Sequence, residues 1–170
     1  MAVRKLDDLR LKAGSDYLSA LISLGLEPDG LFWAFEKAES RWVLALVTNY
    51  FDVAGPLNLS EVLFKAYRAA ATPREIDPFM VRMFSPKQAF IRDISAFLAN
   101  TRITVRDWDE ESNSFGQKYL AQERADVAFG NESYEVPINV VYRLKDPRRD
   151  KVDLARKWAG IERRVKALAA

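Results

Sequence analysis

One short segment, Trp42–Thr48, constrains the fold of this chain more than any other. Its residues are almost all apolar, so a strand built from them carries apolar side chains on both faces. Such a strand needs cover on both faces, which predicts a central place in a sheet. The alternating residues Leu31, Trp33 and Phe35 predict another strand just before it, and the interruption at residues 37–41 predicts a hairpin.

The spacing of apolar residues predicts a first helix over residues 6–24. Gly14 lies inside that run, where a glycine weakens a helix, so we expect the helix to restart with Ser15 as its N-cap. Later N-cap signals predict the starts of three further helices, at Asn58, Ser85 and Asp150.

Further strands are expected at residues 79–84, 102–108, 119–129 and 134–142. Pro137 cannot donate a backbone hydrogen bond, which predicts that the last of these strands lies at a sheet edge. The expected order, α-β-β-α-β-α-β-β-β-α, predicts an α+β fold with a mixed β-sheet of about five to six strands and helices packed on it. Residues 1–149 are expected to form a single domain. Residues 150–170 are expected to form a basic amphipathic helix packed on that domain or on a partner.

The composition excludes several kinds of chemistry. The chain has no cysteine and no histidine, which removes disulfides, Cys/His zinc sites, thiolate nucleophiles and Ser-His-Asp triads. It has no glycine-rich phosphate-binding loop of the P-loop or Rossmann type. We therefore expect no cofactor and no catalytic residue, and the sequence favours a protein that is not an enzyme.

Asp107 and Asp109 keep a metal site open. On a continuing strand they share one face and can hold Mg²⁺ for a hydrolase, whereas in a solvated loop they have no such role. No Asp or Glu begins a [D/E]-x-K motif, which argues against the usual metal-dependent nuclease core.

Asp52 is a second candidate, because it follows the buried strand and ligands collect beyond the carboxyl ends of parallel strands. Its expected neighbours at that place are Asn49, Tyr50, Ser85 and Lys87. The alternative is ordinary turn and helix-capping chemistry.

The carboxyl-terminal segment carries most of the positive charge. From Arg143 onward ten basic residues stand against four acidic ones, so this segment is net +6 in a chain of net +2. Apolar residues in the last helix recur at spacings of 4, 3, 4 and 3. They form a narrow apolar seam: Leu154, Trp158, Ile161, Val165 and Leu168.

Three uses of this helix are open. The seam packs on the domain's own core, or it binds a protein partner or a second copy, or the basic residues bind nucleic-acid phosphates. The basic residues of the third use are Arg148, Arg149, Arg156, Lys157, Arg163 and Arg164. Our first hypothesis is a non-enzymatic protein-interaction or oligomerisation domain. Nucleic-acid binding and a Mg²⁺-dependent hydrolase are the alternatives.

The apolar strand is preceded by Gly25-Leu26-Glu27-Pro28 and followed by Asp52, Gly55-Pro56-Leu57 and later Phe84-Ser85-Pro86. In these motifs, over residues 15–100, the chain resembles a loosely defined group of bacterial proteins without assigned function. The resemblance implies a bacterial origin and no particular activity. The apolar runs are far shorter than the roughly 20 residues that cross a bilayer, and the amino-terminal segment turns acidic. We therefore expect a cytoplasmic protein without a membrane contact.

Overall fold

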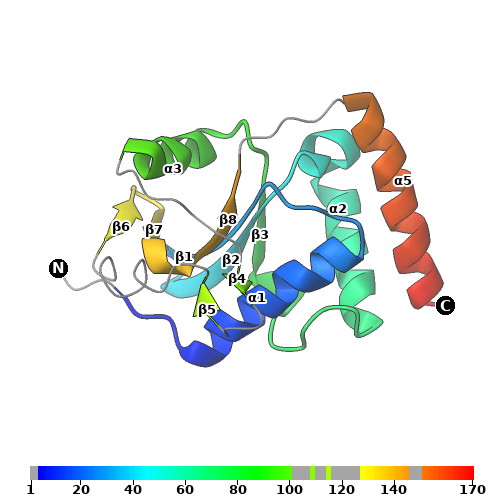
Figure 1. The fold of residues 1–170 in the computed structure, drawn as a ribbon, viewed down its shortest axis with the longest axis horizontal. Coiled ribbons are helices and arrows are strands. Elements are labelled where there is room, and N and C mark those ends of the chain that lie inside the picture. The colour runs from blue at the N-terminus through cyan, green and yellow to red at the C-terminus, as the bar shows by residue number, and fades with distance from the viewer. Residues whose placement is uncertain (1–3, 101–107, 110–113, 116–126, 146–150) are drawn as a thin grey trace.

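The computed structural model describes residues 4–100, 108–109, 114–115, 127–145 and 151–170. It confirms the predicted α+β class and element order, with helices packed on a mixed six-stranded sheet (Figure 1). The helices are α1 (Asp8–Ser23), α2 (Tyr50–Arg68), α3 (Ala89–Asn100) and α5 (Lys151–Leu168). The strands of the sheet are β1 (Gly30–Glu36), β2 (Arg41–Val47), β3 (Val81–Phe84), β6 (Ala128–Gly130), β7 (Tyr134–Pro137) and β8 (Val141–Leu144). They run in the order β3-β2-β1-β7-β6, and β8 also pairs with β1.

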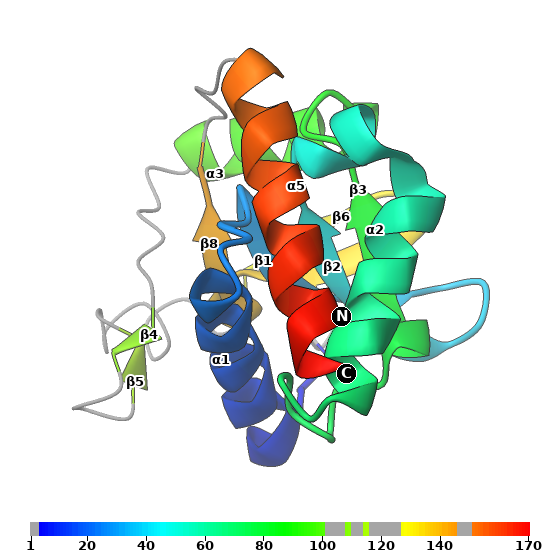
Figure 2. The ribbon, with the colours of Figure 1, turned by 90° about the vertical axis from the view of Figure 1, so that its right-hand side faces the viewer.

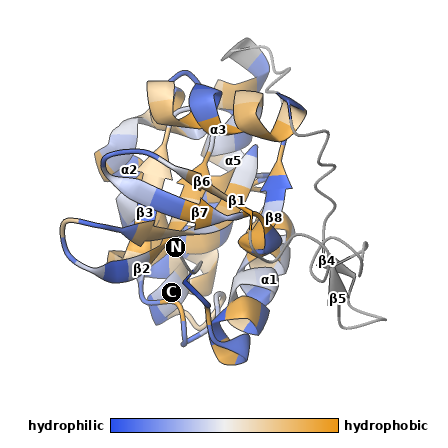
Figure 3. Ribbon diagram, turned by 90° about the vertical axis from the view of Figure 1, so that its left-hand side faces the viewer, coloured by the Kyte–Doolittle hydropathy of each residue, from blue (hydrophilic) through white to orange (hydrophobic). Residues whose placement is uncertain are grey.

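The predicted hairpin of β1 and β2 lies at the centre of the fold, with Gly30 opposite Val47 and Glu36 opposite Arg41. Leu31 on β1 packs in a core shared with α1, α2 and α5, whereas the next residue along β1 packs against α3. Three helices therefore cover one face of the sheet and α3 covers the other (Figures 1 and 2). The central strands between these layers consist mostly of hydrophobic residues, drawn in orange (Figure 3).

Helix α1 is continuous, so the predicted restart at Ser15 is wrong. Its N-cap is Asp7, whose side chain accepts a hydrogen bond from the backbone N–H of Arg10. Gly14 lies inside the helix because the Tyr142 ring occupies the space where a side chain at position 14 would be.

Helix α2 begins at Tyr50, earlier than the predicted start at Asn58. It is broken at Gly55, whose backbone has φ 82° and ψ 157°, a conformation open mainly to glycine. Pro56 follows the break, where its missing N–H does no harm. Asn58 donates its side-chain amide to the carbonyl of Ala54 at 2.8 Å, so it bridges the break and caps nothing.

After α2 the chain forms a short 3₁₀ turn, η1 (Pro78–Met80), and then β3, which pairs in parallel with β2. The predicted capping box is present, since the N–H of Ser85 donates to Gln88 Oε1 at 3.1 Å. The N–H of Lys87 donates to Ser85 Oγ at 3.2 Å. The regular helix α3 begins only after this turn.

The last predicted strand of the sheet is divided by a second 3₁₀ turn, η2 (Ile138–Val140), into β7 and β8. Strand β7 lies between β1 and β6, so the prediction that Pro137 marks a sheet edge is wrong. Pro137 stands instead at the point where pairing with β1 is interrupted. A separate strand pair consists of β4 (Trp108–Asp109) and β5 (Ser114–Phe115), while the strands predicted over 102–107 and 119–126 lie outside the described residues.

Helix α5 packs along α2, so residues 151–170 belong to the same folded unit as the sheet (Figure 2). In the described part of the chain, no helix has the length and apolarity needed to cross a membrane.

Candidate functional site

The apolar seam of α5 lies inside the chain's own core. Four of its five residues are buried: Leu154, Trp158, Ile161 and Val165. The Trp158 ring, 7% exposed, has its centroid 5.5 Å from that of Tyr50 at the start of α2. This corrects the prediction that the seam offers a partner surface, because its apolar area is already removed from water within the chain. Only Leu168 among the seam residues is well exposed, at 53%.

The basic side chains of α5 that the structure describes are all exposed, and four of them form two groups. Arg156 and Arg163 belong to the first, and Arg163 Nε donates to the carbonyl of Ala159 at 3.4 Å. Lys157 and Arg164 form the second and line a hollow beside the helix. The other predicted nucleic-acid residues, Arg148 and Arg149, lie outside the described residues, and nucleic-acid binding stays a prediction.

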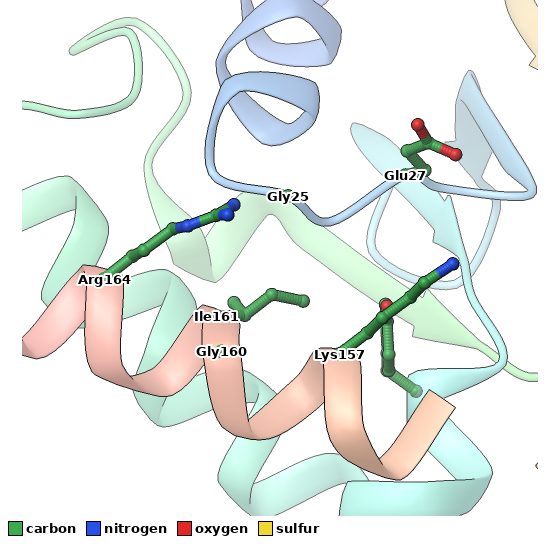
Figure 4. Close-up of a pocket in the computed structure, with 7 residues that line it drawn as sticks. Gly25, Glu27, Lys157, Gly160, Ile161 and Arg164 are labelled. Atoms are coloured by element: carbon green, nitrogen blue, oxygen red, sulfur yellow. The ribbon is translucent and has the colours of Figure 1, made fainter. Parts of the chain in front are cut away.

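The hollow between α5 and the turn after α1 has a volume of about 260 Å³, and we term it the α1–α5 hollow (Figure 4). It is lined by Gly25, Glu27, Tyr50, Lys157, Gly160, Ile161 and Arg164. Lys157 Nζ lies 3.0 Å from Asp153 Oδ2 on the same helix. The Arg164 side chain reaches the backbone of Gly25, where a Cβ would collide with its guanidinium.

The structure brings two of the four residues expected around Asp52, Ser85 and Lys87, into contact with it. Ser85 Oγ donates to Asp52 Oδ2 at 2.7 Å, and Lys87 Nζ lies 3.9 Å from the same oxygen. Asn49 turns elsewhere: its backbone and side-chain N–H groups both donate to Oδ2 of Asp29, at 3.0 and 3.1 Å. These contacts join the ends of β2 and β3 to the turns that follow, which is the turn and capping alternative.

The predicted magnesium site cannot be placed among the described side chains. Asp107 lies outside the described residues, and Asp109 belongs to β4. Within the described ranges no group of three or more acidic, histidine or cysteine residues is arranged to hold a metal ion. The Mg²⁺ alternative therefore stays a prediction.

An apolar surface that the sequence reading missed lies between α2, η1 and β3. Leu57 on α2 and Phe79 on η1 are each 71% exposed, although both side chains are large and apolar. Phe64 lies beside Phe79, with ring centroids 4.9 Å apart in an edge-to-face arrangement. Leu57 and Phe64 line one hollow, so the three residues form one partly exposed apolar patch.

Two hollows of about 200 and 320 Å³ adjoin at this patch, because Ser60 and Phe64 line both. We term the pair the α2–β3 groove. Its apolar lining includes Leu57, Phe64, Pro78, Phe79 and Met83. Three charged residues of α2 border it: Glu61, Lys65 and Arg68.

The signal for this groove was present in the sequence. Positions 57, 61, 64, 65 and 68 share one helical face, next to the buried face that carries Leu59, Val62 and Leu63. The predicted helix begins at Asn58 and so excludes Leu57, and the strand predicted over residues 79–84 does not place Phe79 beside α2.

At the hairpin end of the sheet, the Glu36 carboxylate links three strands. Arg82 on β3 donates to both of its oxygens, at 3.4 and 3.3 Å, and Arg41 on β2 donates at 3.2 Å. Burial alone would raise the pKa of Glu36, but the hydrogen bonds from Arg82 and Arg41 hold it below its ordinary value. Burial, with a contribution from Glu36, raises the pKa of the neighbouring Tyr134.

Comparison with known proteins gives no match to a protein-family model, to a curated protein or to a solved structure. The candidate surfaces therefore rest on the geometry of this chain alone.

Proposed function

We propose that this chain is a protein-interaction domain that associates with a second copy of itself through the α2–β3 groove. The observation that carries the proposal is the exposure of Leu57 and Phe79 on either side of the groove. Contiguous apolar patches on a soluble monomer tend to mark interaction sites, because leaving such area in water is unfavourable. The proposal keeps the predicted oligomerisation role and moves it from α5 to α2. It retains the expected bacterial, cytoplasmic setting.

The charges beside the groove favour a second copy as the occupant. Along one face of α2, Glu61 comes first and Lys65 and Arg68 follow. In a two-fold dimer with the two α2 helices antiparallel, Glu61 of each copy meets Lys65 of the other. Ser60, a small residue between Leu57 and Phe64, leaves room for the helices to approach.

Sedimentation velocity over a range of protein concentrations tests this proposal. The wild-type chain is expected to form a dimer as concentration rises. Leu57→Glu and Phe79→Glu place a charge in the groove and should weaken the dimer roughly tenfold or more. Leu9→Glu is the matched control, because Leu9 on α1 is similarly exposed, at 67%, and lies outside the groove.

Charge reversal tests the antiparallel arrangement separately. Glu61→Lys and Lys65→Glu should each weaken the dimer, and the double variant should recover it because the ion pairs are restored with opposite sense. A wild-type chain that stays monomeric at every concentration, or a dimer unaffected by Phe79→Glu, contradicts the proposal.

A further inference from the structure

The α1–α5 hollow shares no residue with the α2–β3 groove and requires a separate explanation. We propose that it binds a small linear dianion, a molecule with one acidic group at each end and an apolar chain between, of which an α,ω-dicarboxylate is the simplest example. The hollow's volume of about 260 Å³ is close to the lower end of the range usual for small-molecule pockets, roughly 300–1,000 Å³.

Arg164 provides one end of the site. Its side chain extends from α5 to the turn after α1, and its guanidinium lies against Gly25, where any side chain would displace it (Figure 4). Arg164 makes no ion pair with any residue that the structure describes. A guanidinium in this place can offer a carboxylate two parallel hydrogen bonds.

Lys157 provides the other end. It lies seven residues before Arg164 on the same side of α5, so the two Cα atoms are about 10.5 Å apart along the helix. Its contact with Asp153 joins two half-exposed side chains, and such a surface pair is weak enough to exchange for a ligand. The only acidic residue of the lining, Glu27, directs its carboxylate away from α5 (Figure 4).

Gly160 lies between the two cations and gives an independent reason to expect an occupant. A glycine inside a helix costs about 1 kcal/mol relative to alanine. Packing does not require it, because a Cβ at this position would find no atom within 4 Å. With Ile161 beside it, the glycine leaves an open apolar floor between two positive ends. Two separated cations suit an extended dianion better than a compact one, which can reach only one of them.

Titration of the ¹⁵N-labelled full chain at low ionic strength tests the proposal. The probes are butanedioate, heptanedioate, nonanedioate and inorganic phosphate, and the readout is the amide signals of Gly25 and Gly160. The longer dicarboxylates should give saturable shifts at these two glycines. Butanedioate and phosphate should bind at least tenfold more weakly, because they lose one charge-assisted contact.

Variants separate this site from general attraction to a basic helix. Arg164→Gln and Lys157→Gln should each weaken heptanedioate binding about tenfold, whereas Arg163→Gln, a control on the same helix outside the hollow, should leave it unchanged. Gly160→Leu should abolish binding by filling the floor while the chain stays folded, since leucine favours the helix.

Three outcomes would overturn the proposal. They are the absence of saturable shifts with any dicarboxylate, equal binding of phosphate and heptanedioate, and unchanged binding in Arg164→Gln. If Arg164→Gln lowers the melting temperature and leaves heptanedioate binding unchanged, Arg164 stabilises the carboxyl end of α1 and does not bind the ligand.

Discussion

The Tyr142 ring on β8 occupies the space in which position 14 of α1 would otherwise carry a side chain. A Cβ on Gly14 would lie 2.5 Å from Cζ of that ring. The ring is held in place, because its hydroxyl accepts a hydrogen bond from Trp33 Nε1 at 3.1 Å and donates one to the carbonyl of Leu11. Close contact between α1 and β8 therefore depends on a residue that weakens the helix locally.

Gly14→Ala should destabilise the protein by about 1–3 kcal/mol, because the methyl group overpacks against a buried ring that cannot move aside. Helix propensity alone predicts the opposite sign. Urea unfolding at neutral pH measures the difference. Gly160→Ala is the matched control: its Cβ meets no atom within 4 Å, so it should gain up to about 1 kcal/mol. A Gly14→Ala chain as stable as the wild type would show that the ring adapts.

Gly14 shows where prediction from sequence ends. The hairpin, the covered strand and the Ser85 capping box follow from local patterns, and all three are present. The need for glycine at position 14 comes from Tyr142, a residue far away in the chain, which no local pattern reveals. The same holds for α5, whose seam was predicted residue by residue, while the surface it packs against depends on the tertiary fold. The groove was missed because η1 brings Phe79 beside α2 only after folding.

The break in α2 gives a second prediction. Gly55 has φ 82° and ψ 157°, a backbone region that side-chain-bearing residues rarely adopt. Gly55→Ala should therefore lose about 1–3 kcal/mol of stability in urea unfolding, although a Cβ there has open space. Gly130→Ala is the control, since Gly130 also has open space and its φ is not positive. Equal stabilities of the two variants would refute a strained break.

Glu36 gives a prediction for acid stability. Because Arg82 and Arg41 hold its pKa below the ordinary value, the folded state favours the ionised form. That contribution is fully present above the unfolded pKa of about 4.3 and is lost as pH falls through the lower folded pKa. Glu36→Gln should lower the melting temperature at pH 7 and flatten its decline between about pH 5 and 3. Glu75→Gln, at an exposed position without a described ion pair, should follow the wild-type curve. Parallel curves for all three proteins would contradict this role.

Substitution of Trp158 tests whether α5 is part of the core or a detachable partner surface. Its ring is buried against Tyr50, so Trp158→Ala leaves a cavity between α5 and α2 and should cost about 3–5 kcal/mol of stability. Leu168→Ala, on the same seam but 53% exposed, should change stability by no more than about 0.5 kcal/mol. Urea unfolding measures both, and sedimentation of the folded Leu168→Ala chain should show wild-type dimerisation.

Removing residues 151–170 would expose the apolar face of α2, so the truncated chain should unfold rather than remain a folded monomer. A folded, stable truncated chain would restore the view that α5 is an accessory helix.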